Sequence, residues 1–221
     1  MIQALLCDID GTLVQSNWLH AAAWKDAFAG AGIDVELEDV RRQIGKGGDT
    51  LVPVFVPWWR RDAIEEPLKA YRKFIFHQDY LHQVQPLPKV REFLLRLKAA
   101  GIRLSLASSA DQQDLAIYKK LAHMEDLIEE ESSADDADKS KPNPDIFIAT
   151  LKKLGVQPKH ALALGDTPYD AEAAGKAGVW TIGVTTGGWS KADLLEAGCI
   201  EAYDDVADLL ENFDQSALVR C

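Results

Sequence analysis

Two carboxylates separated by a single residue follow a short apolar run near the start of the chain. The segment LLCDIDGTL contains Asp8 and Asp10, with Gly11 and Thr12 directly after them. Side chains two positions apart in an extended chain point the same way, so both carboxylates can face one spot just past the run. Two such charges about 4 Å apart repel by several kcal/mol at an effective dielectric constant of about 20, so a cation or a shared proton must accompany them. Taken alone, the pattern also fits a solvated acidic turn.

Hydroxyl groups and a lysine occur at comparable places further along the chain. Ser108 and Ser109 end a second apolar run just before a helical pattern. Unpaired N–H groups at such a helix start attract an anion, although serine is also a common helix cap. Lys141 precedes Pro142, which keeps the lysine out of helical geometry and fixes it at a corner. By itself, Lys141 also fits an ordinary surface lysine.

A second pair of acids follows a later apolar run. Asp166 comes directly after this run, in the same position that Asp8 has after its own. Asp170 lies in the first turn of the next helical pattern, where interaction with the helix dipole is a simpler explanation. Hard divalent cations prefer oxygen ligands, so an Mg²⁺ ion shared between these carboxylates and a phosphate would account for the acids. A lysine and a hydroxyl suit the remaining oxygens of the phosphate.

Short apolar runs that alternate with helical patterns must position these side chains. Runs of four to eight apolar residues without strict alternation predict strands that are buried on both faces. Helical patterns between them, such as 90–100 and 144–154, end at a glycine. The alternation predicts an α/β fold, a Rossmann-like doubly wound parallel sheet, whose carboxyl strand ends bind ligands. The runs are 2–7, 102–107, 160–164 and 179–184, with weaker ones at 127–129 and 200–203.

The region from residue 16 to residue 85 interrupts this alternation. It contains no convincing strand, and Pro86 and Pro88 mark the return to the first pattern. We expect an all-helical cap domain of residues 16–85, inserted into an α/β core domain of residues 1–15 and 86–221. The helical patterns of the cap are 18–29, 36–43, 49–55 and 64–84, and 129–138 in the core is interpreted as an acidic loop.

The composition limits the partners and the compartment of the protein. With 24 basic and 35 acidic residues, the formal net charge is -11, which disfavours nucleic acid and anionic membranes as partners. Three cysteines without metal-ligand spacing favour a reducing compartment. The N-terminal apolar run is too short for a signal peptide, and no apolar stretch approaches the roughly 18 residues of a membrane span. We expect a cytoplasmic protein; the sequence indicates no oligomeric state, and a monomer or a weak dimer would both fit.

The acids, the hydroxyl and the lysine together resemble the motifs of the haloacid dehalogenase superfamily. The resemblance is to its phosphatase branch with a helical cap after the first motif, which includes phosphoglycolate phosphatases and β-phosphoglucomutases. The matching segments occur in family order from residue 8 to residue 170. They are Asp8-x-Asp10-Gly11-Thr12, Ser108, Lys141-Pro142 and Gly165-Asp166-x-x-x-Asp170.

The resemblance implies a role for each matching residue. Asp8 is expected to attack the phosphorus of a small phosphorylated metabolite, and Asp10 to act as general acid and base. Mg²⁺ would be held by Asp8, the backbone carbonyl of Asp10 and Asp166, with Asp170 binding through water or orienting the ligands. Ser108 and Lys141 would bind the transferred phosphoryl group, Ser109 would add an N–H group, and Thr12 would orient Asp10.

Cap residues are expected to determine the substrate. The segment IGKGGDT resembles a cap loop of the family, and Lys46 in it would meet a carboxylate or hydroxyl of the substrate; a flexible solvated turn is the alternative. His20 and Trp24 lie on one face of a cap helix and resemble a His-x-x-x-Trp pattern of relatives, for which packing or hinge support is favoured over chemistry. Trp58 and Trp59 are interpreted as core or surface of the cap.

These observations predict a magnesium-dependent phosphatase that hydrolyses a phosphoglycolate-like or sugar-phosphate-like ester through an aspartyl-phosphate. The nearest alternative is a phosphomutase, which would carry an arginine roughly where this chain has Gly48, unless Arg41 or Arg42 replaces it. A carbon–halogen hydrolase would lack Asp10. A non-catalytic binding relative is disfavoured because every motif position is present.

Overall fold

The computed structural model describes residues 1–220 and contains a sheet of six parallel strands. The strand order is β5-β4-β1-β6-β7-β8, so β1 lies inside the sheet between β4 and β6. The strands are β1 (Ala4–Cys7), β4 (Arg103–Ala107), β5 (Glu130–Ser132), β6 (Ala161–Gly165), β7 (Trp180–Val184) and β8 (Cys199–Tyr203).

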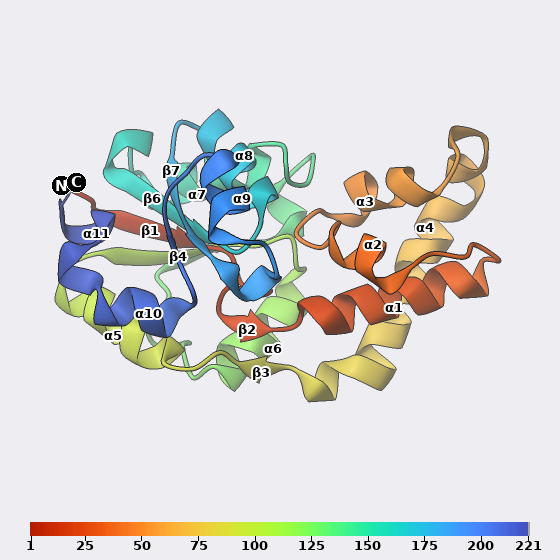
Figure 1. Cartoon of the computed structure of the whole chain (residues 1–221), viewed down its shortest axis with the longest axis horizontal. Coiled ribbons are helices and arrows are strands. Elements are labelled where there is room, and N and C mark those ends of the chain that lie inside the picture. The colour runs from red at the N-terminus through yellow and green to blue at the C-terminus, as the bar shows by residue number, and fades with distance from the viewer. Residues whose placement is uncertain (221) are drawn as a thin grey trace.

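Helices cover both faces of this sheet. Their bounds are α5 (Val90–Ala99), α6 (Gln112–Leu121), α7 (Asp145–Leu154), α8 (Pro168–Lys176), α9 (Lys191–Glu196), α10 (Val206–Glu211) and α11 (Ala217–Arg220). Figure 1 shows α7 and α8 on one side of the sheet and α5 and α10 on the other. The predicted doubly wound α/β fold is confirmed.

The two faces of β1 pack into two separate apolar clusters. Leu5 and Cys7 belong to a cluster with side chains of α5, α6 and α10, whereas Ala4 and Leu6 belong to one with α7 and α8. All four residues are fully buried. Because side chains alternate between the faces of a strand, an unbroken apolar run is what a strand covered on both sides requires.

Four α-helices lie along the chain between β1 and α5, the helix that precedes β4. They are α1 (Asn17–Gly30), α2 (Leu37–Arg41), α3 (Gly48–Phe55) and α4 (Trp58–Ile75). Figure 1 shows them beyond one end of the sheet, opposite the end where both chain termini lie. The strands β2 (Val14–Gln15) and β3 (Gln85–Pro86) pair antiparallel where the chain leaves and re-enters the core. We propose that the chain divides at this crossing into a cap of residues 16–85 and a core of residues 1–15 and 86–221.

Three elements differ from the sequence-based predictions. The pair β2 and β3 was not predicted, because strands of two residues carry no detectable pattern. Helix α4 begins at Trp58 rather than at residue 64, and after Ile75 it gives way to a π-helical turn, Phe76–Tyr80. Strand β5 lies at Glu130–Ser132, inside the predicted acidic loop and after the predicted run 127–129. As an edge strand it tolerates the charged residues that hid it.

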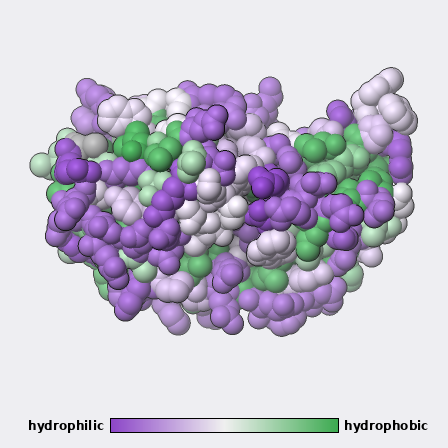
Figure 2. Space-filling view, viewed as in Figure 1, coloured by the Kyte–Doolittle hydropathy of each residue, from purple (hydrophilic) through white to green (hydrophobic). Residues whose placement is uncertain are grey.

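The molecular surface is mainly hydrophilic on the face drawn in Figure 2, and its outline is hollowed between the core and the far end of the cap. Trp58 and Trp59 lie on the cap surface, with 73% and 68% of their area exposed, which places them outside the cap core. Within residues 1–220, no helix has both the length and the apolar character to cross a membrane.

Candidate active site

The turn after β1 brings the first motif against the end of β6. The Asp8 amide donates to the Leu164 carbonyl at 2.9 Å, which continues the pairing of the two strands by one residue. The chain then turns at Gly11, which has a φ of 78°. A Cβ atom at Gly11 would lie 2.2 Å from Asp166 Oδ2, so only glycine allows the backbone to approach this carboxylate.

A buried lysine lies between two carboxylates of the site. Lys141 Nζ is 2.5 Å from Asp8 Oδ1 and 2.7 Å from Asp170 Oδ1, and the lysine side chain is 0% exposed. Oxygen atoms of Asp8, Asp166 and Asp170 all lie within 4.8 Å of one another. The structure therefore brings together four predicted residues that span the chain from position 8 to position 170, and it excludes the alternative of a surface lysine.

The charges in this cluster do not balance. Three carboxylates surround one ammonium group, and burial is the main cause that raises the pKa of Asp8 to about 7 and the pKa of Asp166 well above its ordinary value. The negative charge of Asp170 raises both further, while Lys141 lowers the pKa of Asp8. A divalent cation bound by oxygen atoms would remove this imbalance, so the donor set fits Mg²⁺.

Hydrogen bonds fix the carboxylates of the second motif. Asp166 accepts from Thr12 Oγ1 at 3.1 Å and from Asn17 Nδ2 at 2.6 Å. Asp170 accepts from the Thr167 amide at 3.1 Å and from its hydroxyl at 2.7 Å, which forms a capping box at the start of α8. The prediction that Thr12 orients Asp10 is wrong, because its hydroxyl donates to Asp166 and more weakly, at 3.4 Å, to Asp8.

Asp10 is held from the cap side instead. Its Oδ1 lies 2.5 Å from Ser16 Oγ and 2.8 Å from His20 Nε2. Burial alone would raise the pKa of Asp10, but the interactions with His20, Ser16 and Arg72 hold it below its usual value. The carboxylate is not part of the three-carboxylate cluster, so Asp10 is available for proton transfer rather than for binding a cation through its side chain.

His20 connects Asp10 to an arginine of α4. Its Nδ1 lies 2.6 Å from Arg72 Nη2, and its ring stacks on Phe76 with the centroids 4.1 Å apart. Since arginine can only donate, Nδ1 accepts and Nε2 carries the proton that is donated to Asp10. His20 therefore positions Asp10, which agrees with the predicted hinge support more than with binding of a phosphate.

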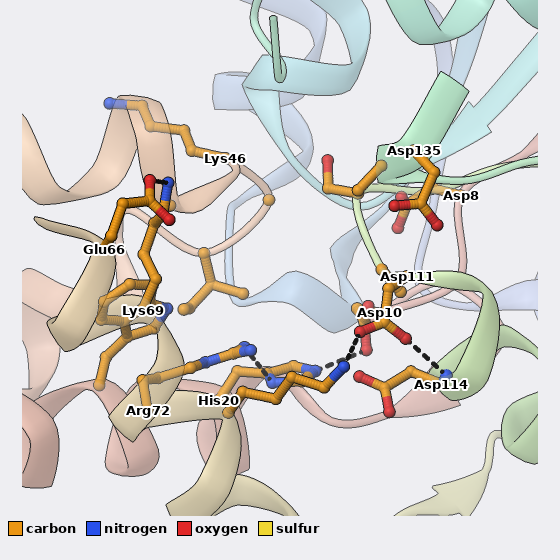
Figure 3. Close-up of a pocket in the computed structure, with 18 residues that line it drawn as sticks. Asp8, Asp10, His20, Lys46, Glu66, Lys69, Arg72, Asp111, Asp114 and Asp135 are labelled. Atoms are coloured by element: carbon orange, nitrogen blue, oxygen red, sulfur yellow. Dashed lines mark hydrogen bonds and ion pairs between the residues drawn. The ribbon is translucent and has the colours of Figure 1, made fainter. Parts of the chain in front are cut away.

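A cavity of about 510 Å³ lies between the cap and the core, and both Asp8 and Asp10 line it. Figure 3 shows its two unlike walls, with Lys46, Lys69, Arg72 and the single carboxylate of Glu66 on the cap side, and a group of carboxylates on the core side. A volume of this size suits a small metabolite. The core-side carboxylates are Asp8, Asp10, Asp111, Asp114 and Asp135.

The predicted cap loop lies against the core next to this cavity. Thr50 Oγ1 donates to the Lys141 carbonyl at 3.0 Å, and the Ser140 amide donates to Asp49 Oδ2 at 3.2 Å. Lys46 lines the cavity, donates to Gln43 Oε1 at 2.6 Å and lies 4.6 Å from the centre of the Tyr169 ring. The loop is thus fixed beside the lysine of the site, which argues against a solvated turn.

The two predicted serines occupy different environments. Ser108 is fully buried, and its Oγ accepts a hydrogen bond from the Ala110 amide at 3.1 Å, which fixes the turn before α6. Ser109 lines the cavity. The structure shows no hydrogen bond between either hydroxyl and the carboxylate cluster of residues 1–220.

Sequence reasoning missed three residues of this network, which are Ser16, Asn17 and Arg72. Ser16 and Asn17 directly follow the first motif, and their polar side chains at the start of a helix resemble ordinary caps. Only the fold shows that they contact Asp10 and Asp166 instead. Arg72 lies 62 positions beyond Asp10, and its distance in sequence gave no signal.

Comparisons with known proteins identify the family. A family model described as haloacid dehalogenase-like hydrolase matches residues 2–178. A phosphoglycolate phosphatase of Rhodospirillum rubrum is 28% identical over 221 residues, which cover 95% of this chain and 90% of that protein. The chain belongs to the haloacid dehalogenase-like hydrolase family, which confirms the predicted family and the prediction of a phosphatase-like hydrolase.

Solved structures agree with this assignment. The crystal structure of a hydrolase from Pseudomonas syringae is 28% identical, has a TM-score of 0.88, and is matched over 97% of this chain and 99% of that chain. A β-phosphoglucomutase from Clostridium difficile has a TM-score of 0.83 over 97% of this chain and 96% of that chain, at 18% identity. At that identity, the second similarity concerns the fold alone.

Proposed function

We propose that this protein is a magnesium-dependent phosphatase, which hydrolyses a small phosphorylated metabolite through an aspartyl-phosphate on Asp8. The observation that carries the proposal is the position of Asp8, which lines the cavity, contacts Lys141 at 2.5 Å and belongs to the three-carboxylate cluster. The similarity to a phosphoglycolate phosphatase supports an ester of the phosphoglycolate kind, and a sugar phosphate stays a prediction from the sequence.

In the first step, an oxygen of Asp8 attacks phosphorus while the bond from phosphorus to the ester oxygen breaks. Covalent catalysis of this kind divides one difficult displacement into two easier ones. Lys141 is placed to stabilise the charge on the phosphoryl oxygens, because its ammonium group already lies against the attacking carboxylate. Ser108 and Ser109, in the turn before α6, are proposed to supply further donors.

Asp10 is proposed to move the proton in both steps. It protonates the leaving ester oxygen and then takes a proton from the water that hydrolyses the aspartyl-phosphate. In the protein alone, the neighbours of Asp10 favour its ionised form. An anionic phosphate in the cavity opposes this effect by raising the pKa of the carboxyl, so the protonated acid becomes available when substrate is bound.

Asp8, Asp166 and Asp170, together with the backbone carbonyl of Asp10, are proposed to hold the Mg²⁺ ion. When bound, the ion lowers the repulsion between the attacking carboxylate and the anionic phosphate. Asn17 and Thr12 fix the orientation of Asp166 toward the cluster. Hydrogen bonds from such neighbours commonly set the affinity of a metal site.

Phosphate release from a panel of small phosphate esters, with and without Mg²⁺, tests this proposal. We expect magnesium-dependent release that is lost in Asp8→Asn while the variant remains folded by circular dichroism. Asp34→Asn is the matched control, because this exposed cap residue lies outside the cavity. Activity of Asp8→Asn near the wild-type level would remove Asp8 from the mechanism.

A phosphomutase would need a cap arginine in place of Gly48, and Arg41 and Arg42 are the two candidates for this role. Arg41 pairs with Glu38 and donates to the Gly187 carbonyl at 2.8 Å, and Arg42 lies over the Trp189 ring. Neither lines the cavity, which argues against the suggestion that one of them replaces the missing arginine. Conversion of a hexose 1-phosphate into its 6-phosphate would establish the mutase reaction.

A further inference from the structure

Four cationic side chains of the cap line the cavity, and three of them are engaged by neighbouring residues. These are Lys69 with Glu65 and Glu66, Lys73 with Asp111, and Lys46 with the Gln43 amide oxygen and the Tyr169 ring. The fourth, Arg72, makes no ion pair with any carboxylate of residues 1–220. Lys46 also contacts only neutral groups, but among the described residues Arg72 is the one of these four cations with a buried donor atom, Nε, that has no acceptor, and Asp10, Asp111 and Asp114 act on its charge only from a distance.

The surroundings of Arg72 make the missing contact partner costly. Its guanidinium lies near the rings of Trp24 and Phe76, at 5.4 and 5.3 Å from their centres. One nitrogen, Nη2, donates to His20, but the buried Nε has no acceptor among the described residues. Buried charges and donors are normally paired, so an acceptor that the protein does not supply is expected from a ligand.

We propose that Arg72 binds a carboxylate of the phosphorylated substrate, and so selects phosphate esters of hydroxy acids over neutral esters. This inference rests on the proposed phosphatase function, and it narrows the substrate class for the same cavity. The cap then recognises one end of the substrate while Asp8 and Lys141 act on the other.

The charges of the opposite wall favour a carboxylate over a second phosphate. Asp111 on the core side of the cavity is paired with Lys73, but Asp114 and Asp135 beside it have no lysine or arginine partner among the described residues, and they repel a doubly charged group more than a singly charged one. A single guanidinium also balances a single negative charge. Its planar set of donors matches the two oxygens of a carboxylate, which permits paired hydrogen bonds.

The geometry also limits the length of the substrate. Asp10 Oδ1 and Arg72 Nη2 are joined through the imidazole of His20 by contacts of 2.8 and 2.6 Å. With the ring between them, these two contacts span roughly 7 Å. An ester oxygen that receives a proton from Asp10 must therefore lie within a few bonds of a carboxylate at Arg72, as in a two-carbon or three-carbon hydroxy acid.

Binding to the Asp8→Asn variant, measured by calorimetry with Mg²⁺, tests this inference without turnover. The probes are 2-phosphoglycolate, 2-hydroxyethyl phosphate, in which a hydroxymethyl group replaces the carboxylate, and ethane-1,2-diol bisphosphate. We expect 2-phosphoglycolate to bind about 10 to 100 times more tightly than the neutral ester, the usual range for a charged hydrogen bond.

Adding Arg72→Met should reduce this preference to within about threefold, and Arg72→Lys should retain part of it. Arg60→Met is the matched control, because it removes the same charge from an exposed position of α4 and should leave the preference unchanged. Melting temperatures verify that each variant is folded. If Arg72→Met does not fold, a preference in Arg72→Lys equal to that of Asp8→Asn alone would overturn the inference.

Three results with folded variants would contradict the assignment of Arg72. They are equal affinity for 2-phosphoglycolate and 2-hydroxyethyl phosphate, a preference that survives Arg72→Met, and tighter binding of the bisphosphate than of 2-phosphoglycolate. The phosphatase proposal fails separately. If the wild-type protein releases phosphate from none of the probes while the binding preference and its dependence on Arg72 hold, the reaction is wrong and the carboxylate site stands.

Discussion

Replacing Asp8 by asparagine in the metal-free protein should change how stability depends on pH. Burial is the main cause that raises the pKa of Asp8 from 3.8 to about 7. A carboxyl with a raised pKa stabilises the fold in its protonated form, so this contribution is complete below about pH 4 and is lost as the pH rises through about 7. Asparagine at position 8 has no such dependence.

The size of the effect follows from the two pKa values. One pH unit of difference corresponds to about 1.4 kcal/mol, and the loss between pH 5 and pH 8 amounts to roughly 3 kcal/mol. This is an upper limit, because Asp166 and Asp170 share the electrostatic cost with Asp8. Relative to the wild type, Asp8→Asn should therefore gain up to about 3 kcal/mol over this range.

Urea unfolding in EDTA between pH 5 and pH 8 measures this difference in the free energy of unfolding. Asp34→Asn serves as the control, because it removes an exposed aspartate of the cap. Addition of Mg²⁺ should stabilise the wild type at pH 8 more than Asp8→Asn. A stability difference between the wild type and Asp8→Asn that stays constant from pH 5 to pH 8 would refute the reasoning about the buried carboxylates.

Three further substitutions test other contacts of the site. Lys141→Met should abolish most turnover and lower the stability by about 3–5 kcal/mol at neutral pH, because two buried carboxylates lose their cation; unchanged urea unfolding would contradict this. Asn17→Ala should raise the Mg²⁺ concentration for half-maximal thermal stabilisation by about tenfold, because Asp166 loses a hydrogen bond of 2.6 Å, and an unchanged Mg²⁺ titration would argue against this role. Lys73→Met removes a partly exposed ion pair with Asp111 between cap and core, and such a pair contributes little. Steady-state kinetics should therefore show KM raised by at most about fivefold with kcat unchanged, and a large loss of kcat would contradict this and show that the contact between cap and core limits the reaction.

The sequence predicted the central strands and the residues of the carboxylate cluster for the same physical reason. A strand covered on both faces must be apolar throughout, and the polar residue that ends it then stands out, as Asp8 and Asp166 do after β1 and β6. Because parallel strands end at one edge of the sheet, side chains far apart in sequence were expected to meet there. Lys141 was found through its proline neighbour and its family motif.

The remaining parts of the site depend on contacts that leave no local pattern. Ser16 and Asn17 contact carboxylates only because the chain turns at Gly11 and enters the cap beside them. Arg72 of α4 contacts His20 of α1, and no spacing in the sequence indicates that these two residues meet. Strand β5 was misplaced because its exposed edge admits glutamates, which replace the apolar run by which the other strands were predicted.

Mass spectrometry of the acid-quenched Asp10→Asn variant tests the central claim most directly. The variant is mixed with p-nitrophenyl phosphate and Mg²⁺, since this leaving group needs no proton from Asp10, whereas hydrolysis of an aspartyl-phosphate needs a base. We predict one phosphoryl group on the peptide that contains Asp8, absent from the double variant Asp8→Asn/Asp10→Asn. Release of nitrophenol without a phosphoryl group on Asp8, or with one on another residue, would contradict the account.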